Sequence, residues 1–211
     1  MRLYSYYRSG TSQRVRIALN LKGLDYEIVP VNLREREHKG ENYLALNPQG
    51  LAPTLEIDGE RLIQSPAILE YLEERFPEPP LLPSAPLEKA RVRALAAIVG
   101  CDIHPVNNLR ILNALRKDYG ADEDAVKQWC GQWICAGFDA LEQMLQTRPG
   151  GRFSHGDSPT LADVYLVPQV YSARRFEVDL SPYKTIVAID RACAELDAFR
   201  IADPANQIDA V

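Results

Sequence analysis

A run of small hydroxyl residues lies near the beginning of the chain, where a strand pattern changes to a helix pattern. Ser9, Thr11 and Ser12 separate alternating residues from a segment, 14–21, whose apolar side chains recur at helical spacing. Each hydroxyl can cap that helix, and the free N–H groups and positive dipole end there favour an anion. A thiolate is such an anion, and hydrogen bonds donated to it would lower the pKa of its thiol. The segment has no cysteine, so a ligand would have to supply the sulfur; an ordinary helix cap is the other interpretation.

A second candidate anion site follows a predicted hairpin over residues 54–63, which turns at an Asp-Gly pair. Pro53 directly before a strand indicates a special backbone arrangement. A cis Ala52–Pro53 bond would leave the N–H and C=O of Ala52 free to pair with an extended peptide. Ser65 as N-cap and Pro66 at the first helical position begin the next helix. Two helix N-termini would then face one edge of a small sheet and could bind a peptide-like anion.

The order of the predicted elements divides the chain into two domains. The first part has the pattern strand, helix, strand, short helix, hairpin and helix. A proline cluster over residues 77–86 indicates a linker, and beyond it apolar residues recur at helical spacing with almost no strand signal. We therefore predict an α/β plus all-α chain, with a mixed domain over 1–82 and an all-helical domain over 83–211.

Composition excludes several classes of function. The chain has 211 residues and a net charge of −5, which gives no general electrostatic support for nucleic-acid binding. No apolar run is long enough to span a bilayer, so we expect a cytoplasmic protein without a membrane partner. Four cysteines lie in helical patterns without a CxxC pair and are expected to be small buried side chains; no metal site is predicted: Cys101, Cys130, Cys135 and Cys193.

Motifs over nearly the whole chain resemble the zeta class of the glutathione transferases, the family that includes maleylacetoacetate and maleylpyruvate isomerases. The matching stretches are Arg-Ser-Gly-Thr-Ser at 8–12, Ala-Leu-Asn-Pro at 45–48, Gln-Ser at 64–65, Leu-Ala-Asp at 161–163, Leu-Val-Pro-Gln-Val at 166–170 and Arg-Phe-Glu-Val-Asp-Leu at 175–180. The resemblance implies a thioredoxin-like first domain of βαβ-α-ββα order, an all-helical second domain, glutathione as cofactor and a homodimer.

The resemblance also implies the residues of the site. Ser9 matches the serine directed at the glutathione sulfur. Thr11 replaces a cysteine found in many zeta members, so it remains the other candidate for the sulfur's partner. The remaining predicted glutathione contacts are His38, Gln49, Ala52, Pro53, Gln64, Ser65, His104 and Asn108. A surface role is the alternative for His38, and His104 could instead orient substrate, act as an acid, or be an ordinary helix histidine. The resemblance further implies an N-capping box, without chemistry, at Thr160 and Asp163.

The predicted activity is a glutathione-dependent cis–trans isomerisation by reversible thiolate addition, bond rotation and elimination. The segments at 8–12 and 101–110 look like bacterial maleylpyruvate isomerases, which favours conversion of maleylpyruvate to fumarylpyruvate in gentisate-type aromatic catabolism. That substrate is a dicarboxylate, and Arg8, Arg110 and Arg175 are the candidate ligands of its carboxylates; a surface role is the alternative for each, and for Arg110 it is equally favoured. The alternatives are a maleylacetoacetate isomerase of tyrosine and phenylalanine catabolism, a general conjugating transferase and a non-catalytic domain of this fold.

Overall fold

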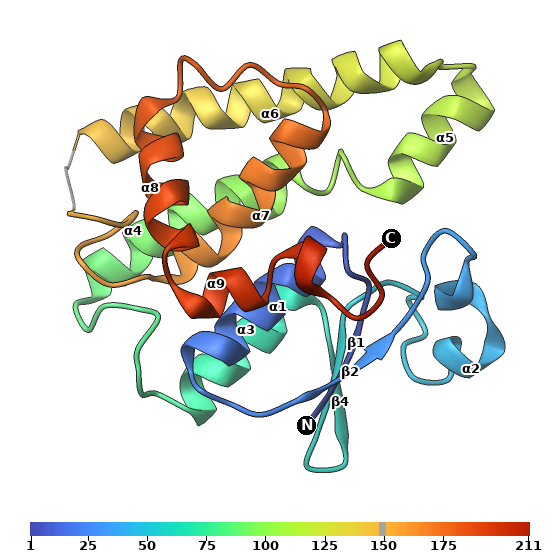
Figure 1. Ribbon diagram of the computed structural model, residues 1–211, viewed down its shortest axis with the longest axis horizontal. Coiled ribbons are helices and arrows are strands. Elements are labelled where there is room, and N and C mark those ends of the chain that lie inside the picture. The colour runs from blue at the N-terminus through green and yellow to red at the C-terminus, as the bar shows by residue number, and fades with distance from the viewer. Residues whose placement is uncertain (148–150) are drawn as a thin grey trace. The chain divides into compact units, whose positions relative to one another are not determined.

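The computed structural model describes residues 1–147 and 151–211 (Figure 1). Two compact units divide the described chain: Met1–Leu81 together with Ala194–Val211, and Leu82–Cys193. The C-terminal segment therefore packs with the first unit, whereas the sequence pattern groups it with the helical domain. Long-range hydrogen bonds explain this difference, because Asn20 donates to the carbonyl oxygen of Ala198 at 2.9 Å, a contact that periodicity does not encode.

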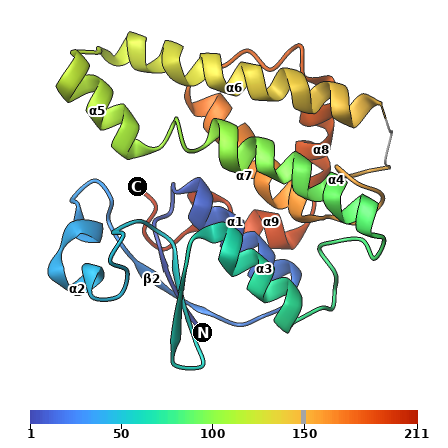
Figure 2. The same cartoon turned by 180° about the vertical axis from the view of Figure 1, so that it is seen from behind.

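The first unit contains a four-stranded mixed sheet in the order β2-β1-β3-β4. Its elements are β1 (Arg2–Ser5), α1 (Gly10–Leu21), β2 (Glu27–Pro30), η1 (Glu37–Lys39), α2 (Glu41–Leu44), β3 (Thr54–Ile57), β4 (Glu60–Ile63), α3 (Ser65–Arg75), α9 (Asp197–Ile201) and η3 (Pro204–Asn206). Strand β1 pairs in parallel with β2 and antiparallel with β3, which pairs antiparallel with β4. The predicted βαβ-α-ββα order is confirmed. Helices α1, α3 and α9 lie together on one side of the strands and α2 on the other (Figures 1 and 2).

The core of this unit follows from side-chain alternation in the strands. Leu3 of β1 and Leu55 of β3 pair across the sheet, and both are fully buried. Val15 and Leu19, one helical turn apart in α1, are also fully buried. Packing therefore fixes β1, which precedes the hydroxyl run, and α1, whose first turn contains it.

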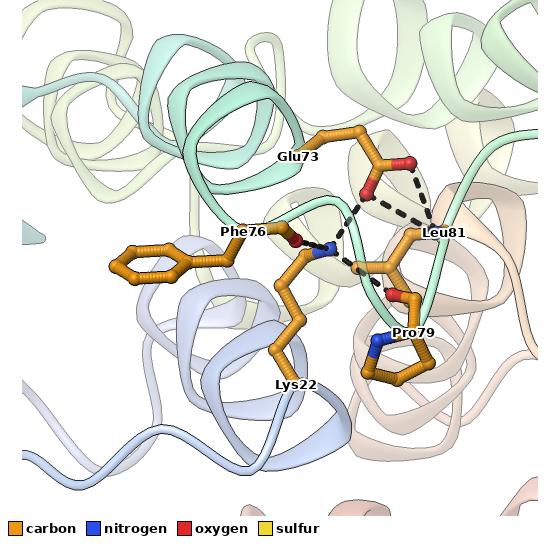
Figure 3. Close-up of polar contacts among 5 residues, drawn as sticks. All are labelled: Lys22, Glu73, Phe76, Pro79 and Leu81. Carbon is orange, nitrogen blue, oxygen red and sulfur yellow. Dashed lines mark hydrogen bonds and ion pairs between the residues drawn. The ribbon is translucent and has the colours of Figure 1, made fainter.

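A buried ammonium group ties the end of α1 to the end of α3 and the segment after it (Figure 3). Lys22 Nζ lies 2.8 Å from Glu73 Oε2 and donates to the carbonyl oxygens of Phe76 at 2.6 Å and Pro79 at 3.1 Å. The Glu73 carboxylate in turn accepts from the Leu81 N–H through both oxygens, at 3.0 and 3.1 Å. These bonds hold the segment from Phe76 to Leu81, the last residue of the N-terminal part of the first unit.

The second unit is helical in its described residues. Its elements are α4 (Pro86–Ala97), the π-helical η2 (Ile98–Ile103), α5 (Leu109–Tyr119), α6 (Glu123–Gln146), α7 (Leu161–Arg175) and α8 (Lys184–Ala194). A Cβ on Gly137 of α6 would lie 2.3 Å from Ile103 Cδ1, so α6 and η2 approach closely only because this residue is glycine. The capping box is confirmed: the Thr160 N–H donates to Asp163 Oδ2 at 2.7 Å, and Asp163 is fully buried.

Candidate active site

The hydroxyl run begins α1 as predicted. Ser9 is the N-cap, with extended backbone angles, and its Oγ accepts from the Ser12 N–H at 3.3 Å. The same Oγ lies 2.9 Å from Thr11 Oγ1, which donates to the carbonyl oxygen of Ala52 at 2.9 Å. A chain of hydroxyls thus connects the start of α1 to the residue before Pro53.

The positions of the two hydroxyl hydrogens, on Ser9 and Thr11, decide which hydroxyl can turn to an anion. Each hydroxyl has a single hydrogen. Because the hydrogen of Thr11 goes to the Ala52 carbonyl, Ser9 must be the donor in the bond between the two hydroxyls. Rotation of the Ser9 hydroxyl releases only that bond, whereas rotation of the Thr11 hydroxyl would disconnect the Ala52 segment. The Ser9 hydroxyl can therefore turn to an anion at the cost of one bond, while the Thr11 hydroxyl holds the Ala52 segment.

The Ala52–Pro53 peptide bond is cis, as predicted, and two side chains hold the residues around it. Tyr43 Oη and Asn47 Nδ2 both donate to the carbonyl oxygen of Leu51, at 2.8 and 2.7 Å. Both also lie within hydrogen-bond distance of Thr54 Oγ1, at 3.0 and 3.2 Å. The sequence pattern does not reveal this support, because the bonds join side chains and a carbonyl oxygen that share no periodic pattern.

The loop over Gln49 and Gly50 is held from η1. Lys39 Nζ donates to the Gly50 carbonyl oxygen at 2.7 Å and more weakly to that of Gln49 at 3.4 Å. Gly50 has φ +58°, and a Cβ there would lie 2.7 Å from the His38 carbonyl oxygen. His38 is largely buried, and its Nδ1 has no hydrogen-bond partner among the described residues. Burial, together with the charges of Lys39 and Arg36, lowers the pKa of His38, so its imidazole is neutral at pH 7.

Helix α3 begins one residue earlier than predicted. Gln64 is its N-cap, with φ +69°, and Ser65 is its first helical residue instead of its cap. The side chain of Gln64 donates to Gln49 Oε1. Ser65 Oγ is buried and has no hydrogen-bond partner among the described residues. A buried hydroxyl beside the free N–H groups of a helix start is suited to a carboxylate, so these residues fit a ligand with a carboxylate end.

Arg8 directly precedes the N-cap serine, and its guanidinium lies 5.3 Å from the centre of the Tyr7 ring. Its Nε is buried and has no hydrogen-bond partner among the described residues. The first unit therefore brings Arg8 to the same turn as Ser9 and Thr11, and brings Gln49 to the side chain of Gln64.

The other predicted site residues belong to the second unit. His104 follows η2 and is half-buried. Asn108 is the N-cap of α5, where its side chain accepts from the backbone N–H of Arg110, whose side chain is exposed. Arg175 ends α7, with its guanidinium 4.5 Å from the centre of the Phe176 ring. These assignments stay predictions.

The described residues contain no group of three or more potential ligands that could hold a metal ion. Among the described helices, none is both long and apolar enough to cross a membrane.

Comparison with known proteins supplies the family. The family model for the glutathione S-transferase N-terminal domain matches residues 3–80. Maleylpyruvate isomerase from Ralstonia sp is 62% identical over 210 residues, which cover 99% of each chain. A solved holo structure of maleyl pyruvate isomerase, described as a bacterial glutathione S-transferase of the zeta class, has 61% identity, a TM-score of 0.99 and full coverage of both chains. The chain belongs to the zeta class of the glutathione transferases.

This membership confirms the predicted glutathione transferase fold. Another relative was solved with ligands in its active site. The maleylacetoacetate isomerase from Anaeromyxobacter dehalogenans 2CP-1 was solved with glutathione bound in its active site, at 48% identity and a TM-score of 0.89, covering 100% of this chain and 97% of that one. Another structure of the same enzyme contains dicarboxyethyl glutathione and citrate in the active site, at 46% identity, a TM-score of 0.88 and the same coverage.

Proposed function

We propose that this protein is a glutathione-dependent cis–trans isomerase that converts maleylpyruvate to fumarylpyruvate. The observation that carries the proposal is the rotatable Ser9 hydroxyl at the N-terminus of α1, in a chain that is 62% identical over its length to a maleylpyruvate isomerase. Glutathione, when bound, supplies a nucleophilic thiol whose reversible addition makes rotation about a conjugated cis double bond possible.

The first unit offers suitable groups for each end of glutathione. Ser65 Oγ and the free N–H groups of the first turn of α3 are suited to a carboxylate. The backbone of Ala52, held in place through Thr11, can pair with a peptide. The partnerless Nδ1 of neutral His38 and the Gln49–Gln64 pair supply further polar groups. These residues would bind and orient the tripeptide.

At the sulfur end, Ser9 would donate a hydrogen bond and α1 would contribute its positive dipole end. Both stabilise the thiolate relative to the thiol and so lower the pKa of the thiol. The Ser9 hydroxyl can make this bond by rotation, because its hydrogen is otherwise engaged only with Thr11.

The substrate class is a small dicarboxylate. Arg8 supports this, because it directly precedes Ser9. The N–H of its buried Nε has no hydrogen-bond partner among the described residues and could donate to a carboxylate. The citrate and the dicarboxyethyl group bound by the Anaeromyxobacter relative are also small polycarboxylate groups, with three and two carboxylates. We propose Arg110 and Arg175 as further carboxylate ligands and assign His104 and Asn108 to glutathione.

Product analysis tests the proposal. Maleylpyruvate and maleylacetoacetate are each incubated with the protein and glutathione, and both the trans product and any glutathione conjugate are measured. The proposal predicts the trans product of maleylpyruvate without loss of glutathione, and a severalfold slower reaction with maleylacetoacetate. Accumulating conjugate would instead identify a conjugating transferase, and a preference for the longer substrate would identify a maleylacetoacetate isomerase.

We further propose a cytoplasmic homodimer that acts in aromatic catabolism, and family membership is its support. An amphipathic pattern in α4 that could face a partner is not part of this support, because Val92 and Leu95 are buried within the single chain. Sedimentation at micromolar concentration tests the dimer, and a monomer would contradict it.

A further inference from the structure

Two successive peptide groups before Arg8 are held through hydrogen bonds on both sides. The Tyr6 carbonyl oxygen accepts from the Ser9 N–H at 3.0 Å and from Arg16 Nη1 at 3.4 Å. The Tyr7 N–H donates to Asp209 Oδ2 at 2.9 Å, and the Tyr7 carbonyl oxygen accepts from Arg16 Nη2 at 2.9 Å. The backbone that leads into Arg8 and Ser9 is thus fixed by one residue of α1 and one residue near the chain end.

Arg16 is fully buried and joins the same backbone to the C-terminal segment. Its Nε and Nη2 donate to the carbonyl oxygen of Ala202, at 3.3 and 3.0 Å. Burial lowers the pKa of Arg16 to about 10, while Tyr26, Asp209 and Asp203 act in the opposite direction. The guanidinium therefore stays protonated at neutral pH, and the Asp209 carboxylate supplies part of its compensating charge.

The C-terminal segment is ordered by its own polar contacts. Gln207 Nε2 donates to the carbonyl oxygens of Ile201 at 2.7 Å and Asp203 at 2.9 Å. In contrast, Ile208 is 74% exposed, so apolar burial does not hold the last residues in place. Figure 1 shows the chain end beside the loop between β1 and α1, where Asp209 makes its contact.

We propose that Asp209 is a positioning residue for the site at the start of α1. By accepting the Tyr7 N–H it fixes the peptide group two residues before Ser9, and so it holds Ser9 and Arg8 in the geometry that binds the glutathione sulfur and the substrate carboxylate. Asp209 touches neither ligand and acts through the backbone. The inference rests on the proposed function.

Three variants test the role of Asp209. Asp209→Ala removes the acceptor, Asp209→Asn keeps an oxygen that can accept from the Tyr7 N–H, and Asp197→Ala removes an exposed carboxylate of the same segment, 72% exposed and paired with Arg200. Asp209→Ala is expected to weaken glutathione binding, measured by calorimetry, by up to about tenfold. Without Asp209 the turn is not held in its binding geometry before the ligand arrives, and binding loses the free energy of ordering it, which is at most that of one charge-assisted hydrogen bond. Asp209→Asn should recover most of the affinity, and Asp197→Ala should match the wild type.

Amide hydrogen exchange without glutathione provides a second readout. The Ser9 N–H, bonded to the Tyr6 carbonyl oxygen, should exchange severalfold faster in Asp209→Ala than in the wild type. A variant that only lowers the melting temperature, with wild-type affinity and exchange, would overturn the proposal. If Asp209→Ala does not fold, Asp209→Ser, whose shorter side chain falls short of the Tyr7 N–H, takes its place. A wild-type protein without glutathione-dependent turnover would refute the proposed function, while the exchange result would still decide the role of Asp209.

Discussion

Replacing Ser9 tests how the start of α1 ionises a thiol. In the wild type, the Ser9 hydroxyl must leave Thr11 before it can donate to a thiolate. A hydrogen bond to a charged group contributes about 1.5–3 kcal/mol, and the neutral bond that is given up contributes about 1 kcal/mol. The net stabilisation of the thiolate is then about 0.5–2 kcal/mol. Since one pKa unit corresponds to about 1.4 kcal/mol, Ser9→Ala should raise the thiol pKa of bound glutathione by about 0.5–1.5 units.

The capping role of Ser9 must be separated from this effect. Ser9→Ala also removes the acceptor for the Ser12 N–H, which costs about 1 kcal/mol of stability. Glycine is a much better N-cap than alanine and also lacks the hydroxyl, so Ser9→Gly should lose only a few tenths of a kcal/mol. The two variants should therefore share the raised thiol pKa and differ in the free energy of unfolding.

Ultraviolet titration of the thiolate in the glutathione complex measures this pKa, with Thr11→Ala as the matched variant. Thr11→Ala should shift the thiol pKa less than Ser9→Ala, because its main loss is the bond to the Ala52 carbonyl oxygen. An unchanged thiol pKa in Ser9→Ala with a raised one in Thr11→Ala would refute the assignment and make Thr11 the donor.

Three further predictions concern the supports of the fold. Glu73→Gln should lower the free energy of unfolding by about 3–5 kcal/mol, because it removes the carboxylate paired with the buried Lys22 ammonium. Urea unfolding measures this, with Glu74→Gln at an exposed position as the control. An equal loss of stability in the two variants would contradict the prediction. Glu142 accepts from the N–H groups of Thr185 and Ile186 at the start of α8; burial raises the pKa of Glu142, but these bonds outweigh it and the pKa is lowered. The ionised Glu142 side chain therefore stabilises the fold fully above the ordinary glutamate pKa of 4.5, and this stabilisation is lost as the pH falls through the lowered pKa of the folded state. The difference in unfolding free energy between the wild type and Glu142→Gln should then close in acid. A difference that does not change with pH would contradict this. Gly50→Ala should cost about 2 kcal/mol and weaken glutathione binding in calorimetry, because a Cβ would lie 2.7 Å from the His38 carbonyl oxygen at a positive φ; a neutral outcome would show that the loop can move.

Local patterns in the sequence were sufficient for the order of the elements in the first unit and for the start of α1. The alternation in β1, the Asp-Gly turn and the serine before α1 each act within a few residues, so their structural outcome can be derived from the sequence. The start of α3 was wrong by one residue, because Gln64 adopts a positive φ that its residue type does not announce.

What the sequence did not reveal depends on contacts between distant residues. Tyr43 and Asn47 support the Ala52 segment through the Leu51 carbonyl oxygen, and Asp209 reaches Tyr7 across 202 positions. Such bonds leave no periodic signal, and no short motif marks their polar partners. For the same reason, the C-terminal segment was grouped with the helical domain by its pattern.

The proposed isomerisation requires glutathione. The most direct measurement is the rate of maleylpyruvate isomerisation by protein dialysed free of thiols, followed by addition of glutathione or of S-methylglutathione, which lacks a free thiol. We predict loss of turnover after dialysis, recovery with glutathione and no recovery with the S-methyl compound. Undiminished turnover in the dialysed protein would contradict it.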